Sequence, residues 1–276
     1  NKELPKWLSK NTKEGRAIVE RCAVAAKARM SAKKARELTK RKSILETSGL
    51  PGKLADCSST DPSESELFIV EGDSAAGPAK QARESKTQAI LPIRGKIINV
   101  QKVTENRALQ NEEISSLIKA IGTGIKGEYK GEESRYDKII FLTDADVDGA
   151  HIRTLLLTFF FKFMPGLIKE GKVWIAEPPL YRAKSSGSIN YLKDDQALDA
   201  FKKENKKKKF DISRFKGLGE MNAGELWDTA MNPETRSLIK VSIADGKAAE
   251  AKAANMFEVL MGNDVARRKT FIEQNA

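Results

Sequence analysis

Two acidic clusters hold the side chains of this sequence that are best suited to chemistry. Glu71 follows a short apolar run, and Asp144, Asp146 and Asp148 occupy alternate positions directly after another apolar run. Aspartates at this spacing bring like charges within a few Å, which costs free energy unless a divalent cation or strong donors neutralise them. Mg²⁺ is typically held by a few carboxylates together with substrate phosphate oxygens. The two clusters therefore predict a magnesium site.

Three other interpretations of the aspartates explain less. The alternating aspartates match the start of a calcium-binding EF-hand loop, but the twelfth position holds Leu155 instead of Glu, and a predicted strand precedes them. A helix N-cap at Asp144 with a dipole contact at Asp148 explains one or two aspartates but not Glu71. A phosphatase with a nucleophilic Asp144 and an acid–base Asp146 leaves Glu71 and the basic N-terminal residues unexplained.

Basic residues between and after the acidic clusters suit contact with phosphate. Arg94 and Lys96 flank Gly95, which allows close approach of the backbone. Arg214–Glu220 is a second glycine-rich basic segment, which could equally be structural. His151 is the single histidine and falls in the first turn of a predicted helix, where contact with phosphate or DNA fits better than activation of a nucleophile.

Alternating strands and helices must position these side chains. Repeated β-then-α units predict an α/β fold with a doubly wound parallel sheet flanked by helices, and the order becomes a less regular α+β tail beyond Pro178. Ligands of such sheets lie outside the carboxyl ends of the strands, where both acidic clusters fall. The predicted strands are Leu67–Val70, Ala89–Leu91, Lys138–Leu142, Val173–Ala176 and Ile189–Leu192, and the predicted helices are Ser74–Ser85, Asn111–Ile121, Gly149–Ile168, Gln196–Lys203, Gly224–Met231 and Ala248–Met261.

Positive charge is concentrated near the N-terminus. The 276 residues carry a formal charge of +11, and residues 1–50 hold 14 Lys and Arg against 5 Asp and Glu, a balance of +9. Helical spacing of apolar residues and the absence of Pro and Gly predict a long basic helix over Arg16–Lys42. Its charged face is either solvated or close to phosphates. Glycine, proline and serine residues then predict a boundary near residue 60.

Composition excludes several classes of protein. With 40% hydrophobic and 32% charged residues the chain is globular, and no apolar run reaches the 18 or so residues that a membrane helix requires. Cys22 and Cys57 cannot form a disulfide framework and lack metal-ligand spacing, which fits a reducing cytosol. The chain starts at Asn1 without a signal-like stretch, so we expect it to be cut from a longer polypeptide.

Four motifs occur in the order found in a known enzyme family. They are Glu71–Ala75 (EGDSA), Pro92–Lys96 (PIRGK), Asp144–Gly149 (DADVDG) and Lys216–Met221 (KGLGEM). On these motifs the chain resembles the C-terminal half of the B subunit of bacterial type IIA topoisomerases, from about residue 16 to its end. This family includes the B subunit of DNA gyrase, which is the preferred match, and the B subunit of topoisomerase IV, which is the alternative.

The resemblance implies a domain division. Residues 1–60 would be a basic helical arm and linker that follows an ATPase and transducer region, residues 61–180 a Rossmann-like, metal-binding Toprim domain, and residues 181–276 a tail that packs on the Toprim domain and on the A subunit. ATP would be bound only by the preceding region. Primase-like and nuclease-type Toprim proteins share the glutamate and the aspartate pair but have no role for the Lys216–Met221 segment.

The resemblance also implies roles for individual residues. Glu71, Asp144 and Asp146 would bind Mg²⁺, which Mn²⁺ or Ca²⁺ could replace, with Asp148 assisting. Glu71 would also be catalytic, as a general acid or base on the 3′-oxygen. The residues expected to contact DNA are Arg94, Lys96, Asn99, His151 and Lys216.

The nucleophile is expected to come from a partner. The resemblance implies a tyrosine on the A subunit of the topoisomerase and an enzyme of two A and two B subunits that cleaves and rejoins double-stranded DNA in the bacterial cytoplasm, associated with the nucleoid. Tyr136 precedes a predicted strand and is better explained by packing. A basic DNA-binding module without catalysis is the more distant alternative.

Overall fold

The computed structural model describes residues 3–27, 29, 49–185, 187–206 and 208–275. The chain divides into two compact units, residues 1–48 and 49–276, and each is described by itself. In the first unit, α1 spans Glu3–Lys10 and residues 12–27 are also helical. A basic helix is expected over Arg16–Lys42, and the structure confirms helix for residues 16–27 and for Arg29. The other residues of this range lie outside the described part of the chain.

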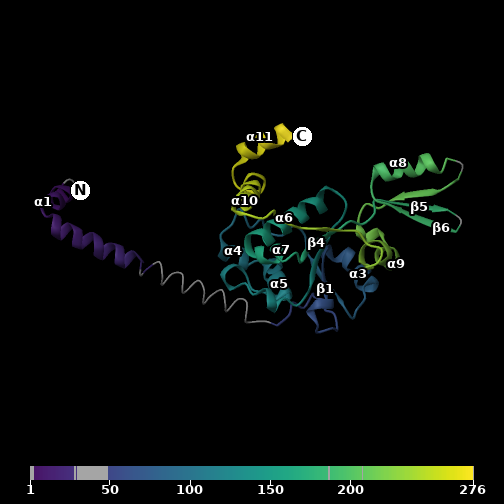
Figure 1. Cartoon of the computed structure of the whole chain (residues 1–276), viewed down its shortest axis with the longest axis horizontal. Coiled ribbons are helices and arrows are strands. Elements are labelled where there is room, and N and C mark those ends of the chain that lie inside the picture. The colour runs from purple at the N-terminus through teal and green to yellow at the C-terminus, as the bar shows by residue number, and fades with distance from the viewer. Residues whose placement is uncertain (1–2, 28, 30–48, 186, 207, 276) are drawn as a thin grey trace. The chain divides into compact units, whose positions relative to one another are not determined.

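A five-stranded sheet forms the centre of the second unit (Figure 1). Its strand order is β2-β1-β3-β4-β8, and the first three pairs of neighbours are parallel, whereas β8 pairs with β4 in the antiparallel direction. β1 and β3 are buried almost throughout, which is typical of central parallel strands covered on both faces. The strands are β1 (Glu66–Glu71), β2 (Gln88–Ile93), β3 (Lys138–Leu142), β4 (Val173–Ala176) and β8 (Leu238–Lys240).

Helices connect the parallel strands. Asn111 caps the start of α5 by accepting hydrogen bonds from Glu113 N and Ile114 N, and Gly122 ends this helix with a φ of 91°. The single helix expected over Gly149–Ile168 is wrong, because Pro165 cannot continue the hydrogen-bond pattern of a helix and begins a second one. The helices of this part are α3 (Gly72–Ala82), α4 (Glu105–Leu109), α5 (Glu112–Ile121), α6 (Val147–Phe163) and α7 (Pro165–Lys169).

The chain after β4 forms a smaller layer and then returns to the main sheet. A three-stranded antiparallel sheet, in the order β6-β5-β7, packs with α8 around Ala183, Leu192 and Leu198, and these green elements lie together in Figure 1. Only the first part of the helix expected over Gly224–Met231 is α-helical, and a π-helical turn, Trp227–Met231, replaces the rest. The remaining strands and α-helices are β5 (Tyr181–Ser185), β6 (Ser188–Leu192), α8 (Asp195–Glu204), β7 (Asp211–Arg214), α9 (Ala223–Leu226), α10 (Lys247–Met261) and α11 (Val265–Asn275), and Leu218–Glu220 forms a short 3₁₀ helix.

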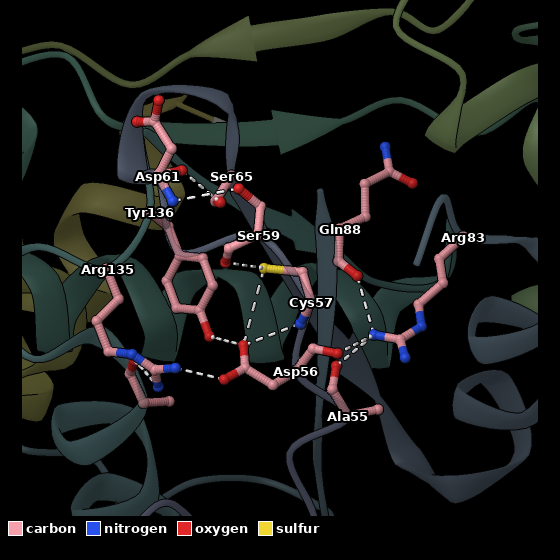
Figure 2. A network of polar contacts seen from close by, with 11 residues as sticks. Ala55, Asp56, Cys57, Ser59, Asp61, Ser65, Arg83, Gln88, Arg135 and Tyr136 are labelled. Atoms are coloured by element: carbon pink, nitrogen blue, oxygen red, sulfur yellow. Dashed lines mark hydrogen bonds and ion pairs between the residues drawn. The ribbon is translucent and has the colours of Figure 1, made fainter. Parts of the chain in front are cut away.

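Residues before β1 attach to the sheet through polar contacts (Figure 2). Ala55 forms an antiparallel bridge with Ile90 of β2, and Arg83 donates hydrogen bonds to the carbonyl oxygens of Ala55 and Asp56 at 2.6 and 2.9 Å. The Asp56 carboxylate accepts a hydrogen bond from the Tyr136 hydroxyl at 2.8 Å and pairs with Arg135. Tyr136 is only 1% exposed, so this tyrosine serves packing and the polar network.

The C-terminal residues share the core of the parallel sheet. A single apolar cluster contains Phe68 and Val70 of β1 together with Leu218 and Met231. A buried ionic network joins the same regions, because Arg236 pairs with Glu66 of β1 at 2.5 and 2.6 Å. Gln88 donates hydrogen bonds to Glu66 Oε2 at 3.1 Å and to the Met231 carbonyl oxygen at 2.9 Å. Residues far apart in the sequence thus stabilise one core.

Replacing Glu66 with Ala tests this network. The side chains of Arg236 and Glu66 are 5% and 9% exposed, so Glu66→Ala leaves a buried, unpaired charge. We expect the free energy of unfolding in urea to fall by about 3–5 kcal/mol. The control is Glu273→Ala, which breaks an exposed pair with Lys269 and is expected to change stability little. Equal stability of the two variants would contradict the structural role of the Glu66–Arg236 pair.

Candidate metal and DNA-binding site

The parallel pairing of β1 and β3 brings the two acidic clusters together. Val70 lies opposite Leu142 in the register, so Glu71 and Asp144 leave the sheet at the same edge. The Glu71 Oε2 atom accepts a hydrogen bond from the backbone N–H of Asp144 at 3.2 Å. The structure therefore joins residues 73 positions apart in the chain at the place where parallel sheets bind ligands.

The other two aspartates belong to the start of α6. Asp146 is its N-cap, and its Oδ1 atom accepts a hydrogen bond from Gly149 N at 2.8 Å. The alternative that placed the N-cap at Asp144 is thus wrong, because Asp146 caps the helix. Asp148 lies in the first turn and pairs with Lys96 at 2.6 Å. Because β3 precedes the aspartates, the EF-hand interpretation, which needs a helix there, is excluded.

Burial and like charges perturb two of these carboxyl groups. Burial raises the pKa of Glu71 above its ordinary value, and the charges of Asp144, Asp146 and Asp148 raise it further. Burial also raises the pKa of Asp144, with added contributions from Asp146 and Glu220. By contrast, the hydrogen bond from Lys96 holds the pKa of exposed Asp148 below its usual range. The edge of the sheet therefore carries a concentrated negative field that favours a bound cation.

A segment from the C-terminal part of the chain also reaches this edge. The backbone N–H of Leu218 donates a hydrogen bond to Asp144 Oδ1 at 2.7 Å. Leu218 itself is buried, and Glu220 Oε2 accepts a hydrogen bond from Lys216 N at 2.9 Å. Sequence reasoning missed the contact with Asp144, because no local pattern indicates which distant loop packs against a strand end.

The donor set fits Mg²⁺ in its chemistry. Glu71, Asp144 and Asp146 supply hard carboxylate oxygens. In each of these side chains one of the two oxygens accepts a backbone hydrogen bond. Within the described part of the chain, no three acidic, histidine or cysteine side chains converge closely enough to enclose a metal. A magnesium ion at this edge would therefore need additional oxygen ligands from water or a substrate, as Mg²⁺ commonly has.

Two basic side chains lie beside the carboxylates. Arg94 and Lys96 are exposed on the turn that follows β2, where Gly95 has a φ of 65°. Arg94 Nε pairs with Asp73 Oδ2 at 3.1 Å, and Lys96 pairs with Asp148. These ion pairs place two cations at the edge that carries Glu71 and Asp144.

The other residues expected to contact DNA have different surroundings. Asn99 Nδ2 donates a hydrogen bond to the Met261 carbonyl oxygen at 2.9 Å, and Asn99 Oδ1 accepts one from Gln101 N at 3.0 Å. The side chain of Asn99 thus links the turn after β2 to the end of α10. His151 is exposed near the start of α6, and Lys216 is exposed in the segment that contacts Asp144.

Comparisons with known proteins agree with this architecture. The Toprim domain family matches residues 66–178, and the family described as DNA gyrase B subunit, carboxyl terminus, matches residues 207–273. Toprim domains bind Mg²⁺ in general. The fold, the site and the match over residues 66–178 thus define a Toprim protein. Separately, none of the described helices is long and apolar enough to cross a membrane.

Comparison with individual relatives identifies the family within the Toprim proteins. The chain is 54% identical to the DNA gyrase B subunit of Staphylococcus epidermidis (strain ATCC 12228) and 52% identical to that of Staphylococcus aureus, over 277 aligned residues in each case. The alignments cover 100% of this chain and 42% of each relative, so the chain spans about two fifths of their length. The chain belongs to the B-subunit family of bacterial type IIA topoisomerases.

The mutual repulsion of the carboxylates can be measured through Glu71. In the metal-free protein, Asp146→Asn removes one negative charge near Glu71, so we expect the pKa of Glu71 to fall toward its ordinary value while remaining above it because of burial. NMR titration of the Glu71 side-chain carboxyl carbon gives this pKa. The control is Asp137→Asn, which precedes β3 at the opposite end of the strand. An unchanged pKa in Asp146→Asn would contradict the charge coupling.

Proposed function

We propose that this chain is the metal-binding part of a DNA gyrase that, together with the gyrase A subunit, transiently cleaves and rejoins double-stranded DNA. The observation that carries the proposal is the meeting of Glu71 and Asp144 at one edge of a parallel sheet, beside Arg94 and Lys96. The similarity to relatives that are DNA gyrase B subunits favours gyrase over topoisomerase IV.

Within this proposal the carboxylates hold the cation. Glu71, Asp144 and Asp146 would bind Mg²⁺, with Mn²⁺ or Ca²⁺ as substitutes, and Asp148 would assist. When bound, the ion stabilises negative charge on the attacking and leaving oxygens of the phosphate. Glu71 is also proposed as the general acid or base on the 3′-oxygen, since its carboxyl group lies at the strand end beside Asp144.

The basic side chains are proposed to hold the DNA backbone. Arg94 presents a guanidinium group and Lys96 an ammonium group, both of which pair well with phosphate, and their exposed ion pairs with Asp73 and Asp148 are easily exchanged for such contacts. Asn99, His151 and Lys216 are proposed as further DNA contacts, with Asn99 acting through the turn that it stabilises.

The remaining parts of the reaction are assigned to partners and to other domains. The A subunit would supply the nucleophilic tyrosine in an assembly of two A and two B subunits, and a domain outside this chain would bind ATP. Residues 1–60 are proposed as the basic arm and linker that lead from that domain, of which residues 49–60 belong to the second compact unit. Residues 61–180 are proposed as the metal-binding domain, and residues 181–276 as the tail that packs on this domain and on the A subunit. The enzyme would act on DNA in the cytoplasm, at the nucleoid.

Asp146→Asn tests the metal role in the assembled enzyme. Asn is also a good N-cap, so α6 should still form while a charged oxygen ligand is lost. With Mg²⁺ and the A subunit present, we expect protein-linked cleavage of plasmid DNA to fall roughly 100-fold, as when one preorganised electrostatic group is removed from a catalytic site. DNA binding should remain.

The matched control is Asp137→Asn, which should cleave DNA like the native chain. Full cleavage by Asp146→Asn would overturn the metal role of Asp146. Failure of the native chain to cleave with any matched A subunit, while it still binds DNA, would instead favour a basic DNA-binding module without catalysis.

Arg94→Ala tests the DNA contact separately from chemistry. If Arg94 contacts one phosphate, the variant should weaken duplex binding equally for different sequences and reduce the slope of log K against log salt by about 0.9. Fluorescence anisotropy at several salt concentrations measures both quantities. Arg107→Ala, at an exposed position of α4, serves as the control, and identical slopes for the two variants would argue against a phosphate contact at Arg94.

A further inference from the structure

The segment that touches Asp144 is anchored on both sides. Phe215, Leu218 and Met221 are all buried, and they belong to the same apolar cluster as Phe68 and Val70 of β1. The backbone between Phe215 and Met221 is therefore held against the carboxyl end of the central strands. The contact with Asp144 is thus made by a segment whose flanking side chains are buried in the core.

Two features of this segment concern the Asp144 carboxylate, namely a hydrogen bond from Leu218 and the absence of a side chain at Gly217. The Leu218 N–H donates a hydrogen bond to Oδ1 at 2.7 Å. At Gly217, a Cβ atom would lie 2.6 Å from Asp144 Oδ2 and 3.0 Å from its Cγ, well inside normal contact. The backbone at Gly217 is extended, with φ −163° and ψ 168°, so a side chain here would disturb the Asp144 carboxylate and not the backbone conformation.

The second glycine of the segment lacks this constraint. A Cβ atom at Gly219 would lie 3.5 Å from Ser74 Cβ, which is an ordinary van der Waals contact. Gly217 and Gly219 therefore differ in their relation to Asp144 although they are two residues apart. This difference supplies a matched pair of positions for an experiment.

We propose that Gly217 and Leu218 are positioning residues that fix the Asp144 carboxylate for metal binding. The inference rests on the proposed magnesium site and assigns part of that site to residues beyond 66–178, the range matched by the Toprim family. The N–H of Leu218 holds one carboxylate oxygen, and the missing side chain at Gly217 leaves the other oxygen in its place. Replacing a group that orients a metal ligand commonly lowers metal affinity about 10–100-fold.

The test is Mn²⁺ binding to the 276-residue chain, measured by electron paramagnetic resonance without DNA or any other protein. We expect Gly217→Ala to weaken Mn²⁺ binding about 10–100-fold, because the added methyl group displaces the Asp144 carboxylate. Gly219→Ala should bind Mn²⁺ like the native chain. The unfolding temperature of each metal-free variant shows whether it is folded.

The outcomes separate the positioning role from the metal site itself. Equal Mn²⁺ affinity of folded Gly217→Ala and Gly219→Ala would overturn the positioning role and leave the proposed function intact. Absence of Mn²⁺ binding by the folded native chain would overturn the metal site and the inference together.

A second measurement needs no change in the glycine segment and applies even if Gly217→Ala does not fold. Amide hydrogen exchange followed by NMR should show that the Leu218 N–H is protected in the metal-free native chain and exchanges faster in Asp144→Ala, which removes its acceptor. Asp148→Ala serves as the control, because Asp148 is exposed and pairs with Lys96. Equal Leu218 exchange in native and Asp144→Ala proteins would overturn the hydrogen bond on which the inference depends.

Discussion

The parallel pairing of β1 with β3 is the constraint on which the site depends. This pairing places Glu71 beside Asp144 and thereby concentrates negative charge at one edge of the sheet. Such crowding is costly, because each carboxylate is partly removed from water while it repels its neighbours. The pKa values of Glu71 and Asp144 are raised because burial and the neighbouring charges disfavour the ionised carboxylates. A bound cation would offset it, which is the physical basis of the proposed magnesium site.

Backbone donors limit the same cost in the absence of a cation. The N–H groups of Asp144, Gly149 and Leu218 each donate a hydrogen bond to a different carboxylate of the site. Each bond occupies one oxygen and orients the side chain without supplying a full positive charge. Arg94 and Lys96 stand at the rim, paired with exposed aspartates, so cationic charge is available for a phosphate. The arrangement favours a polyanionic substrate together with a metal ion.

The site depends on packing between parts of the chain that are distant in sequence. Glu66 and Arg236 form a buried pair, and Leu218 packs in the same core as β1. The core and this ionic pair therefore hold the C-terminal segment against the strand ends. If that segment moved away, Asp144 would lose a hydrogen bond and a close contact at once. Residues matched by the Toprim family and residues beyond it are thus structurally coupled.

Local sequence patterns were sufficient for much of the fold and for the identity of the acidic residues. Short apolar runs predicted β3 and β4 at Lys138–Leu142 and Val173–Ala176, the bounds that the structure shows, because burial and strand length are encoded locally. Residue types and spacing also indicated Arg94, Lys96 and His151, whereas the family resemblance added Asn99 and assigned a DNA contact to Lys216. The antiparallel addition of β8, the Glu66–Arg236 pair and the hydrogen bond from Leu218 to Asp144 were decided only by the tertiary structure. The Leu218–Asp144 hydrogen bond joins residues 74 positions apart, and the Glu66–Arg236 pair joins residues 170 positions apart. No local periodicity specifies which of many polar groups will meet once the core has packed.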